Sequence, residues 1–308
     1  MSAKFLLVDA HALIYRAYYA IPNLTDPQGN LVNAVYGFSK MLLGAINYFE
    51  PEYAAVCFDH KAPTKRKEKY EQYKAQRAAM PDDLIPQIAQ TKAVVDALNI
   101  PRYELAGFEA DDLIGTVNAK VEDCQQDLLT VIVTGDQDAF QLVDDDTHVF
   151  MPARGKQQGD IEYDVDLVRK RLGLEPNQVV DYKALRGDTS DNIPGVKGIG
   201  PKTALQLLQR FGNLEQLYTF LEVHPEGDAQ LKGATLAKLL AGRAEALLSQ
   251  ELAQIDCQVP LDFELEACRV RAYDKTQVTN MFQQLGFKSL LRALPQDAFE
   301  HSVQEALF

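Results

Sequence analysis

Acidic side chains stand at the ends of three short apolar runs in this chain of 308 residues. The runs are rich in Val, Leu, Ala and Phe and cover residues 5–8, 53–58 and 129–133. An aspartate follows each run at once or within three residues, namely Asp9, Asp59 and Asp136. Runs of this length are typical of buried strands. In an open α/β sheet the functional crevice lies outside the carboxyl ends of the strands, so we expect the three carboxylates to face one cleft.

Six further acids extend this group: Glu109, Asp111, Asp112, Asp138, Asp188 and Asp191. Glu109 and Asp112 precede or open a helical pattern and share a face of its first turn. Asp138 follows Asp136 by two residues, so both side chains point to one side if the backbone stays extended. A helix cap or a solvated loop is the plainer interpretation of any one of these acids. Their repetition at successive strand ends favours a functional site.

Nine carboxylates brought together raise one another's pKa values and destabilise the fold unless cations compensate them. Mg²⁺ takes oxygen ligands from a few carboxylates and keeps several waters, so two or three ions could share this set. Two such ions about 3.5–4 Å apart activate a water and stabilise the leaving oxygen when a phosphodiester is hydrolysed. We therefore expect metal ligands among Asp9, Asp59, Glu109, Asp111, Asp112, Asp136, Asp138, Asp188 and Asp191, with Asp136 also counted as catalytic.

A basic segment follows Asp59 directly. Residues 61–77 hold seven Lys or Arg against two Glu, although the chain as a whole has a formal net charge of −13. Basic side chains interleaved with Tyr70 and Tyr73 suit a nucleic-acid single strand, whose phosphates meet charge and whose bases stack on rings. A cation here would also polarise a scissile phosphate oxygen. The alternative, a solvated helix face with extended lysines, is disfavoured by the position of the segment beside the acids.

A glycine-rich stretch, residues 193–204, contains Gly195, Gly198 and Gly200 and runs into a helical pattern. Glycines allow close backbone approach, and helix N-terminal amides bind phosphate. The spacing matches neither a P-loop nor a dinucleotide fingerprint. It fits a helix–hairpin–helix element that holds DNA phosphates without reading sequence. A plain turn between two helices is the alternative.

The elements that must position these residues alternate between strands and helices in the first half of the chain, which predicts an α/β domain with a mainly parallel sheet. A fourth strand is expected at 149–151, and helices at 34–49, 85–98 and 113–122. From about residue 178 only helical patterns remain, at 177–185, 203–211, 214–220 and 235–254. We expect a boundary near 177, a smaller helical domain over 178–290, and a C-terminal tail at 291–308 that is a linker or a docked helix.

Other classes of protein are disfavoured. The four cysteines are far apart and the five histidines are scattered, so neither a disulfide framework nor a zinc site is expected. The N-terminus meets Asp9 after a short apolar run, unlike a signal peptide, and no run approaches the length of a membrane span. We expect a soluble intracellular protein.

Taken in order, these motifs resemble the structure-specific 5′-nuclease (flap endonuclease) family, and within it the 5′→3′ exonuclease domain of bacterial DNA polymerase I. The resemblance covers roughly residues 4–290. It implies a PIN-like nuclease domain over 1–177 with a helical arch at about 61–85. It further implies a helix–three-turn–helix domain, of the helix–hairpin–helix type, that binds duplex DNA.

The resemblance also implies the reaction. Members hydrolyse DNA at 5′ flaps and free 5′ ends with two or more Mg²⁺ or Mn²⁺ ions, in primer removal and repair. Lys74 and Arg77 match the arch motif whose basic residues contact the scissile phosphate, and Arg16 supports them. A K⁺ would be held by the backbone of Gly195, Val196, Gly198 and Gly200. The DNA-binding residues implied are Arg16, Lys65, Arg66, Lys67, Tyr73, Lys74, Arg77, Gly195, Lys197, Gly198, Gly200 and Lys202.

One departure from the family concerns the base of the arch. Relatives commonly have Phe where this chain has Lys65, so an apolar anchor is missing there.

The expected partner is DNA with a 5′ flap, a nick or a free 5′ end, and RNA primer ends are also plausible substrates. We expect a monomer, attached to or working with a DNA polymerase, located in the cytoplasm at the nucleoid. Two alternatives are a non-catalytic module that recognises branched DNA and a PIN-type ribonuclease. The complete set of acids argues against the first, since an inactive module has no physical reason to keep so costly a cluster. The glycine-rich element and the basic segment argue against the second.

Overall fold

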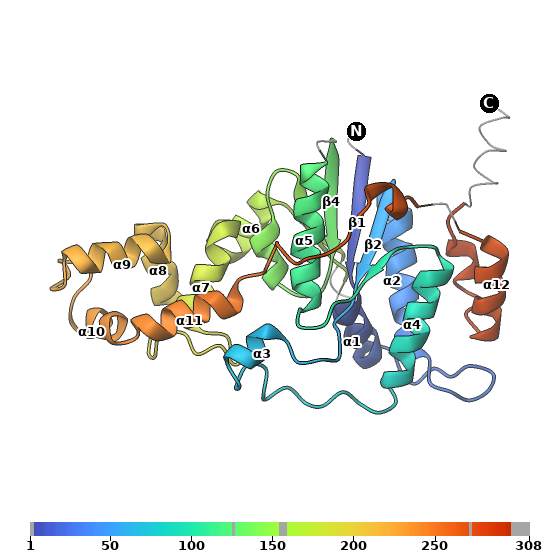
Figure 1. Ribbon diagram of the computed structural model, residues 1–308, viewed down its shortest axis with the longest axis horizontal. Coiled ribbons are helices and arrows are strands. Elements are labelled where there is room, and N and C mark those ends of the chain that lie inside the picture. The colour runs from blue at the N-terminus through green and yellow to red at the C-terminus, as the bar shows by residue number, and fades with distance from the viewer. Residues whose placement is uncertain (1–2, 125–126, 154–158, 271–272, 297–308) are drawn as a thin grey trace.

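The computed structural model describes residues 3–124, 127–153, 159–270 and 273–296. A six-stranded sheet with helices on both faces forms one part of the molecule, and a group of helices forms the other (Figure 1). The strand order is β3-β2-β1-β4-β5-β6, and all neighbours are parallel except β5 and β6. The strands are β1 (Ala3–Asp9), β2 (Tyr53–Cys57), β3 (Arg102–Tyr103), β4 (Leu128–Val133), β5 (Thr147–Met151) and β6 (Ile161–Tyr163).

The central strands are apolar because the sheet is covered on both faces. Side chains along β1 alternate between two cores: Leu6 and Val8 join one cluster, and Phe5 and Leu7 join the other. The four strands expected from apolar runs are confirmed. The short edge strands β3 and β6 were not predicted, because two or three residues carry too little periodicity.

Helices α1 (Ala10–Ala20), α2 (Asn33–Phe49) and α4 (Ile85–Ala97) contribute to the core on one face of the sheet. Helices α5 (Ala110–Asp123) and α6 (Val165–Leu172) contribute to the core on the other. The basic segment is helical only in α3 (Lys65–Lys69) and continues as turns and irregular chain toward α4. Short 3₁₀ helices cover Asp138–Leu142, Pro176–Gln178, Leu265–Cys268 and Leu291–Ala293.

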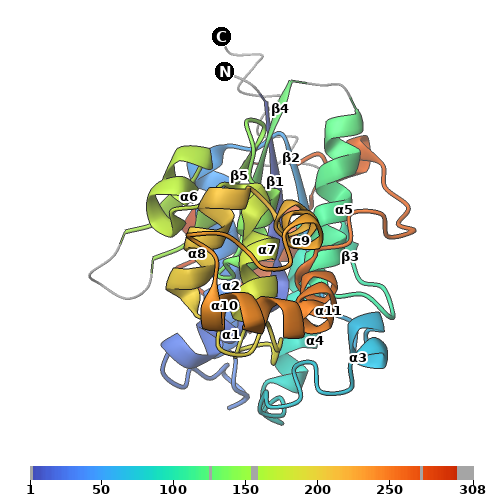
Figure 2. The same cartoon turned by 90° about the vertical axis from the view of Figure 1, so that its left-hand side faces the viewer.

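The second part has its own apolar core, which includes Leu185, Leu208, Leu217 and Leu239. Its helices are α7 (Val179–Arg186), α8 (Pro201–Phe211), α9 (Leu214–Val223), α10 (Gly233–Ala241) and α11 (Arg243–Ala253). The view in Figure 2 places α8 to α11 in front of the sheet. The predicted single helix at 235–254 is wrong, because it breaks at Gly242. There a Cβ atom would lie 2.8 Å from Cγ1 of Val196, so glycine allows the break to pack closely on the hairpin.

After α11 the chain returns to the first part. It crosses the outside of α5 and ends with α12 (Lys275–Gln284) on the far side of the sheet (Figure 1). Val259, Leu265 and Cys268 join one core of the sheet, and Val278 and Phe282 join the other. The domain boundaries at 177 and 290 remain a prediction. The packing of the return segment shows in addition that the last described residues stabilise the first part of the molecule. Residues 297–308, most of the expected tail, lie outside the described residues. Among the helices described, none is long and apolar enough to cross a membrane.

Candidate active site

Asp9 is held at the junction of strand and helix. It ends β1 and caps α1, since Oδ1 accepts the amide of Ala12 at 3.0 Å. Its Oδ2 accepts the hydroxyl of Thr134, which follows β4, at 2.7 Å. Two adjacent parallel strands thus fix one buried carboxylate in place.

Asp59 follows β2 and connects two helix N-termini. Its Oδ1 accepts the amide of Ala110 at 2.7 Å, and its own amide donates to Nδ1 of His11 at 3.0 Å. Burial lowers the pKa of His11, so the neutral ring can accept this bond. The sequence analysis missed His11, because a single histidine in a helix gives no signal of its partner.

The chain after β4 turns sharply. The amide of Asp136 donates to Thr134 Oγ1, and the amide of Asp138 donates to Oδ1 of Asp136, both at 3.0 Å. The backbone does not stay extended here, because Asp138 begins a 3₁₀ helix, so the condition under which both side chains would point to one side is not met. Both acids still line one cleft of about 720 Å³, together with Arg16, Lys183 and Asp188. Arg16 donates to the carbonyls of Pro152, at 2.6 Å, and of Ala153.

Burial and, after it, neighbouring carboxylates raise the pKa values of three acids in the cluster. Burial, aided by Asp59 and Asp136, raises the pKa of Asp9 to about 7. Burial and Asp136 also raise the pKa of Asp138 to about 6, against the effect of Lys183. The pKa of Asp111, at the N-terminus of α5, rises well above its usual value through burial and through Asp136 and Asp9. These groups therefore form one electrostatic cluster at the carboxyl ends of β1 and β4.

The outer acids are paired with cations from the basic segment. Lys74 Nζ lies 2.8 Å from Glu109 Oε2 and 3.7 Å from Asp191 Oδ2, and Arg77 pairs with Asp191. Arg66 pairs with Asp112 at 2.6 Å and with Glu109 at 3.5 Å. The segment therefore closes over the acids and neutralises part of their charge.

Lys183 is a buried cation inside the acidic cleft. It extends from α7, pairs with Asp138, and lies 2.6 Å from Asp188. Burial raises the pKa of Asp188, but Lys183 outweighs it and holds that pKa well below the usual range. The sequence analysis missed Lys183, because an isolated lysine in an amphipathic helix has no pattern that marks it.

The donor chemistry of the site fits hard divalent cations, which prefer carboxylate oxygens. In the described residues, however, no three acids, histidines or cysteines are arranged so that they could hold an ion as their side chains stand. Lysine and arginine side chains compensate several carboxylates instead. Binding of a divalent ion would therefore require local rearrangement of these ion pairs.

Several residues expected to bind DNA face the protein. Tyr73 is buried and its hydroxyl donates to Glu109 Oε2 at 3.1 Å, so its ring is not an open stacking surface. Lys67 Nζ donates to the Tyr73 carbonyl at 3.2 Å. Lys65 Nζ lies 4.0 Å from the centre of the Phe108 ring. A cation–π contact thus stands where the resemblance led us to expect an apolar anchor.

The glycine-rich hairpin is built on close backbone contacts. A Cβ atom at Gly195 would lie 2.1 Å from the amide nitrogen of Gly187, and φ there is +61°. The Gly195 amide donates to Ser249 Oγ at 2.9 Å, which ties the hairpin to α11. Lys238 Nζ donates to the Gly198 carbonyl at 3.0 Å. Of the remaining hairpin positions, Val196 is buried, and three are exposed, namely Lys197, Gly200 and Lys202.

Comparisons with known proteins match nearly the whole chain to one family. A family model described as "5'-3' exonuclease, N-terminal resolvase-like domain" matches residues 4–173. A second, "5'-3' exonuclease, C-terminal SAM fold", matches residues 174–276. DNA polymerase I of Caldicellulosiruptor bescii is 39% identical over 94% of this chain and 33% of its own length. DNA polymerase I of Chloroflexus aurantiacus is 42% identical over 94% of this chain and 30% of its own. The chain thus spans about a third of the length of these relatives.

Two solved structures share the fold. The bacteriophage T5 D15 flap endonuclease, in a pseudo-enzyme-product complex with DNA and metal ions, matches with a TM-score of 0.66 and 18% identity, covering 98% of each chain. The catalytic core of Rad2 in complex with DNA substrate matches with a TM-score of 0.62 and 19% identity, covering 95% of this chain and 93% of its own.

Proposed function

Because the chain belongs to the 5′-3′ exonuclease family, we propose that it is a divalent-metal-dependent nuclease that hydrolyses DNA at 5′ flaps and free 5′ ends. The membership confirms the resemblance drawn from the sequence. The observation that carries the proposal is the cluster of acids at the strand ends beside an open cleft, where burial and then neighbouring acids, Asp136 in each case, raise the pKa values of Asp9, Asp111 and Asp138. Such a cluster is costly unless it serves to bind cations.

The ions in the proposal are two or more Mg²⁺ or Mn²⁺. The carboxylates of Asp9, Asp111, Asp136 and Asp138 would hold them, with Asp59, Glu109, Asp188 and Asp191 completing their surroundings through the side chain or water. Ions held there would supply an activated water and would stabilise the leaving oxygen of the phosphodiester.

Lys74 and Arg77 are proposed to bind the scissile phosphate. In the structure Lys74 forms an ion pair with Glu109, and Arg77 forms one with Asp191. When cations neutralise these acids, the two basic groups become free to donate to phosphate oxygens. Lys183 lowers the pKa of Asp188, so this carboxylate is ionised at neutral pH and can interact with an ion directly or through a bound water.

The hairpin is proposed to hold the downstream duplex through the backbone around Gly195 and Gly200 and the exposed Lys197 and Lys202. A K⁺ there is also part of the proposal. Its fit is partial, since the Gly198 carbonyl already accepts from Lys238. The carbonyls of the neighbouring residues would have to supply most of the ligands.

The wider setting follows from the family. We propose that the chain acts as a monomer on flaps, nicks and RNA primer ends, attached to or alongside a polymerase at the nucleoid. The relatives named DNA polymerase I support the link to a polymerase.

The test is cleavage of a labelled 5′-flap duplex with Mg²⁺, with EDTA, and with the Asp136→Asn variant. We expect cutting near the junction that EDTA and the variant both abolish. Tight flap binding with no cutting in Mg²⁺ or Mn²⁺ would instead identify a non-catalytic module that recognises branched DNA.

A further inference from the structure

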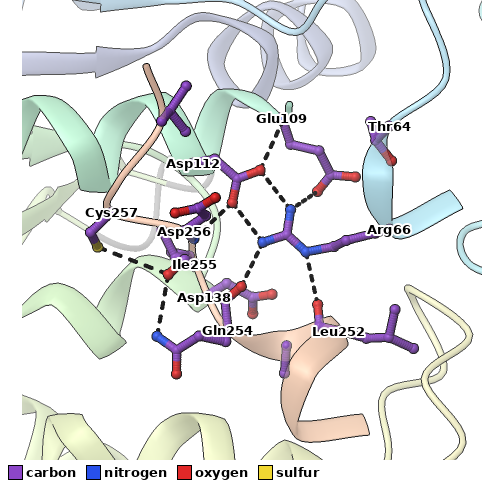
Figure 3. A network of polar contacts seen from close by, with 12 residues as sticks. Thr64, Arg66, Glu109, Asp112, Asp138, Leu252, Gln254, Ile255, Asp256 and Cys257 are labelled. Atoms are coloured by element: carbon purple, nitrogen blue, oxygen red, sulfur yellow. Dashed lines mark hydrogen bonds and ion pairs between the residues drawn. The ribbon is translucent and has the colours of Figure 1, made fainter. Parts of the chain in front are cut away.

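Arg66 is enclosed by protein acceptors rather than open to a ligand (Figure 3). Its two terminal nitrogens donate to Asp112, from Nη1 to Oδ2 at 2.7 Å and from Nη2 to Oδ1 at 2.6 Å. Its Nε donates to the carbonyl of Leu252 at 3.1 Å, and Nη2 also donates to that of Gln254 at 2.6 Å. Only 13% of the side chain is exposed. A guanidinium presents five N–H groups in a fixed fork, and four of them have protein acceptors here.

Asp112 is equally occupied. Besides Arg66, its Oδ2 accepts the amide of Glu109 at 3.1 Å and its Oδ1 accepts the amide of Asp256 at 2.9 Å. A carboxylate has about four lone-pair sites, so all of them are used. Its neighbour Asp111 differs, because burial and then the acids Asp136 and Asp9 raise its pKa, with Lys74 acting against them. The two adjacent aspartates therefore face opposite surroundings.

The Arg66–Asp112 pair joins three segments that are distant in sequence. Arg66 lies in α3, Asp112 in the first turn of α5, and Leu252 and Gln254 at the end of α11. Lys65 strengthens the junction between α3 and the chain that leads into α5. Its amide donates to the Gly107 carbonyl at 2.9 Å, and its ammonium lies over the Phe108 ring.

The junction continues to the hairpin. α11 also carries Ser249, whose hydroxyl accepts the amide of Gly195. An unbroken series of contacts thus runs from the hairpin through α11 to Arg66, and from Arg66 to Asp112 and Glu109. Such a series is a physical route by which one site can be held in register with another.

We propose that Arg66 is a positioning residue whose clamp on Asp112 and on the end of α11 fixes the basic segment and Glu109 relative to the hairpin. Asp112 is then the anchor of the clamp and not a metal ligand, and Arg66 is not a DNA contact. This revises our sequence-based assignments for both residues and rests on the proposed nuclease function. The clamp would place Lys74 over the scissile phosphate once the hairpin holds the duplex.

Two variants separate this role from the alternatives. Arg66→Lys keeps the charge but loses the fork. We expect the single-turnover cleavage rate to fall about tenfold or more, as for other groups that orient ligands. The dissociation constant for flap DNA and its salt dependence should stay unchanged. A phosphate contact would instead lower the slope of log affinity against log salt by nearly one, and that result would overturn the proposal.

Asp112→Asn tests the anchor. Titration with Mn²⁺ in the absence of DNA, followed by electron paramagnetic resonance, should find as many bound ions as in the unsubstituted chain. Asp111→Asn should lose an ion or bind it far more weakly. Loss of a bound Mn²⁺ in Asp112→Asn would show that Asp112 is a ligand after all.

Hydrogen exchange on metal-free protein separates local from global effects. In Arg66→Lys and in Asp112→Asn, the backbone amides of residues 65–70 and 109–112 should exchange faster, while those of the core helix α2 stay protected. Faster exchange everywhere would mean general destabilisation and would contradict a positioning role. Arg269→Lys is the matched control, because Arg269 makes its hydrogen bonds to Glu52, Tyr53 and Glu266, outside the acidic cluster. This variant should change neither the cleavage rate nor the hydrogen exchange at the clamp.

If a single variant fails to fold, Arg66→Met combined with Asp112→Leu removes both charges together, a change that buried ion pairs often tolerate. It should fold and show the same loss of rate as Arg66→Lys. A full cleavage rate in this double variant would refute the clamp. The Mn²⁺ and exchange measurements need no cleavage, so they decide on the clamp even if the unsubstituted chain cuts no DNA.

Discussion

Asp9 illustrates how a single carboxylate is prepared for a cation. Two hydrogen bonds orient it, yet burial and two neighbouring acids raise its pKa to about 7. Orientation and electrostatic cost therefore act at the same residue. A bound divalent ion removes the cost and keeps the orientation.

The metal-free protein should be less stable at pH 8 than at pH 5.5. Asp9 and Asp138 have folded pKa values of about 7 and about 6, above the unfolded value of 3.8, so the folded state binds more protons between these limits. The free energy of unfolding must then fall as pH rises through this window. The depressed pKa of Asp188 works in the opposite sense only at lower pH. The lowered pKa of His11 opposes the trend near pH 6, where the raised pKa values of Asp9, Asp111 and Asp138 outweigh this single histidine.

Thermal unfolding in EDTA at the two pH values measures this effect. Mg²⁺ or Mn²⁺ should raise the midpoint more at pH 8, where the ligands are deprotonated. Asp9→Asn should flatten the pH dependence. A midpoint that rises steadily from pH 5.5 to pH 8 in EDTA would contradict the assignment.

Asp136→Asn should keep the fold and lower the cleavage rate at least about 100-fold, because loss of a metal ligand should cost more than loss of a ligand's hydrogen-bond partner, which costs about 10–100-fold. Asp136 acts on the pKa values of Asp9, Asp111 and Asp138, so its neutralisation relieves repulsion in the metal-free protein. Its thermal midpoint in EDTA should therefore equal or exceed that of the unsubstituted chain. Single-turnover cleavage and a melting curve test both parts.

Lys74→Ala should lower the cleavage rate by about 10²–10³, the usual effect of removing one donor to a developing negative charge. Affinity for duplex DNA should change much less, since the hairpin supplies that binding. Rates at saturating enzyme and a separate binding titration distinguish the two. An unchanged rate would remove Lys74 from the mechanism.

At the scale of elements, the hairpin and α11 depend on glycine at a few positions. Gly195 approaches the backbone of Gly187 so closely that any side chain would collide, and its φ lies in the left-handed region. The contact holds the hairpin against the entry of the loop that carries Asp188 and Asp191. The hairpin and two acids are therefore one structural unit.

Gly195→Ala should weaken duplex binding and destabilise the protein by about 1–3 kcal/mol or more, the cost of backbone strain at such a site. Gly44→Ala is the matched control, because Gly44 lies in α2 and a new Cβ there would have no atom within 4 Å outside its chain neighbours and the backbone of its own helix. That change should be neutral or slightly stabilising. Equal melting temperatures of the two variants would contradict the close contact.

At the scale of the whole molecule, the chain leaves the sheet, forms the helical part and returns. Residues from Val259 onward complete both cores of the sheet. The helical part is thus inserted between two segments that depend on one another, and Arg66 fastens its last helix to the acidic end of the sheet.

A chain that stops at residue 258 should therefore lose stability in the first part. Val278, Phe282 and Phe287 are almost completely buried, and each contributes about 1.5–3 kcal/mol through burial. We expect a thermal midpoint many degrees lower or an insoluble product. A truncated chain that melts like the full one would show that the return segment is dispensable.

Local patterns in the sequence determined the main strands, most of the helices, and the placing of acids at strand ends, because side-chain periodicity and strand polarity act over a few residues. The fold class and the acids around Asp9 could be predicted for that reason. The prediction of a single helix over 235–254 was wrong, because the helix breaks where Gly242 packs on Val196, 46 positions away along the chain.

Only the tertiary structure decided which partner each acid has. Asp111 and Asp112 are adjacent and chemically identical, yet one faces the acidic cluster and the other is enclosed by Arg66 and the amide of Asp256. His11 and Lys183 likewise gain their roles from partners far away in sequence, Asp59 and Asp138 respectively. Pairing of this kind depends on how distant segments close on one another, and no short pattern encodes that.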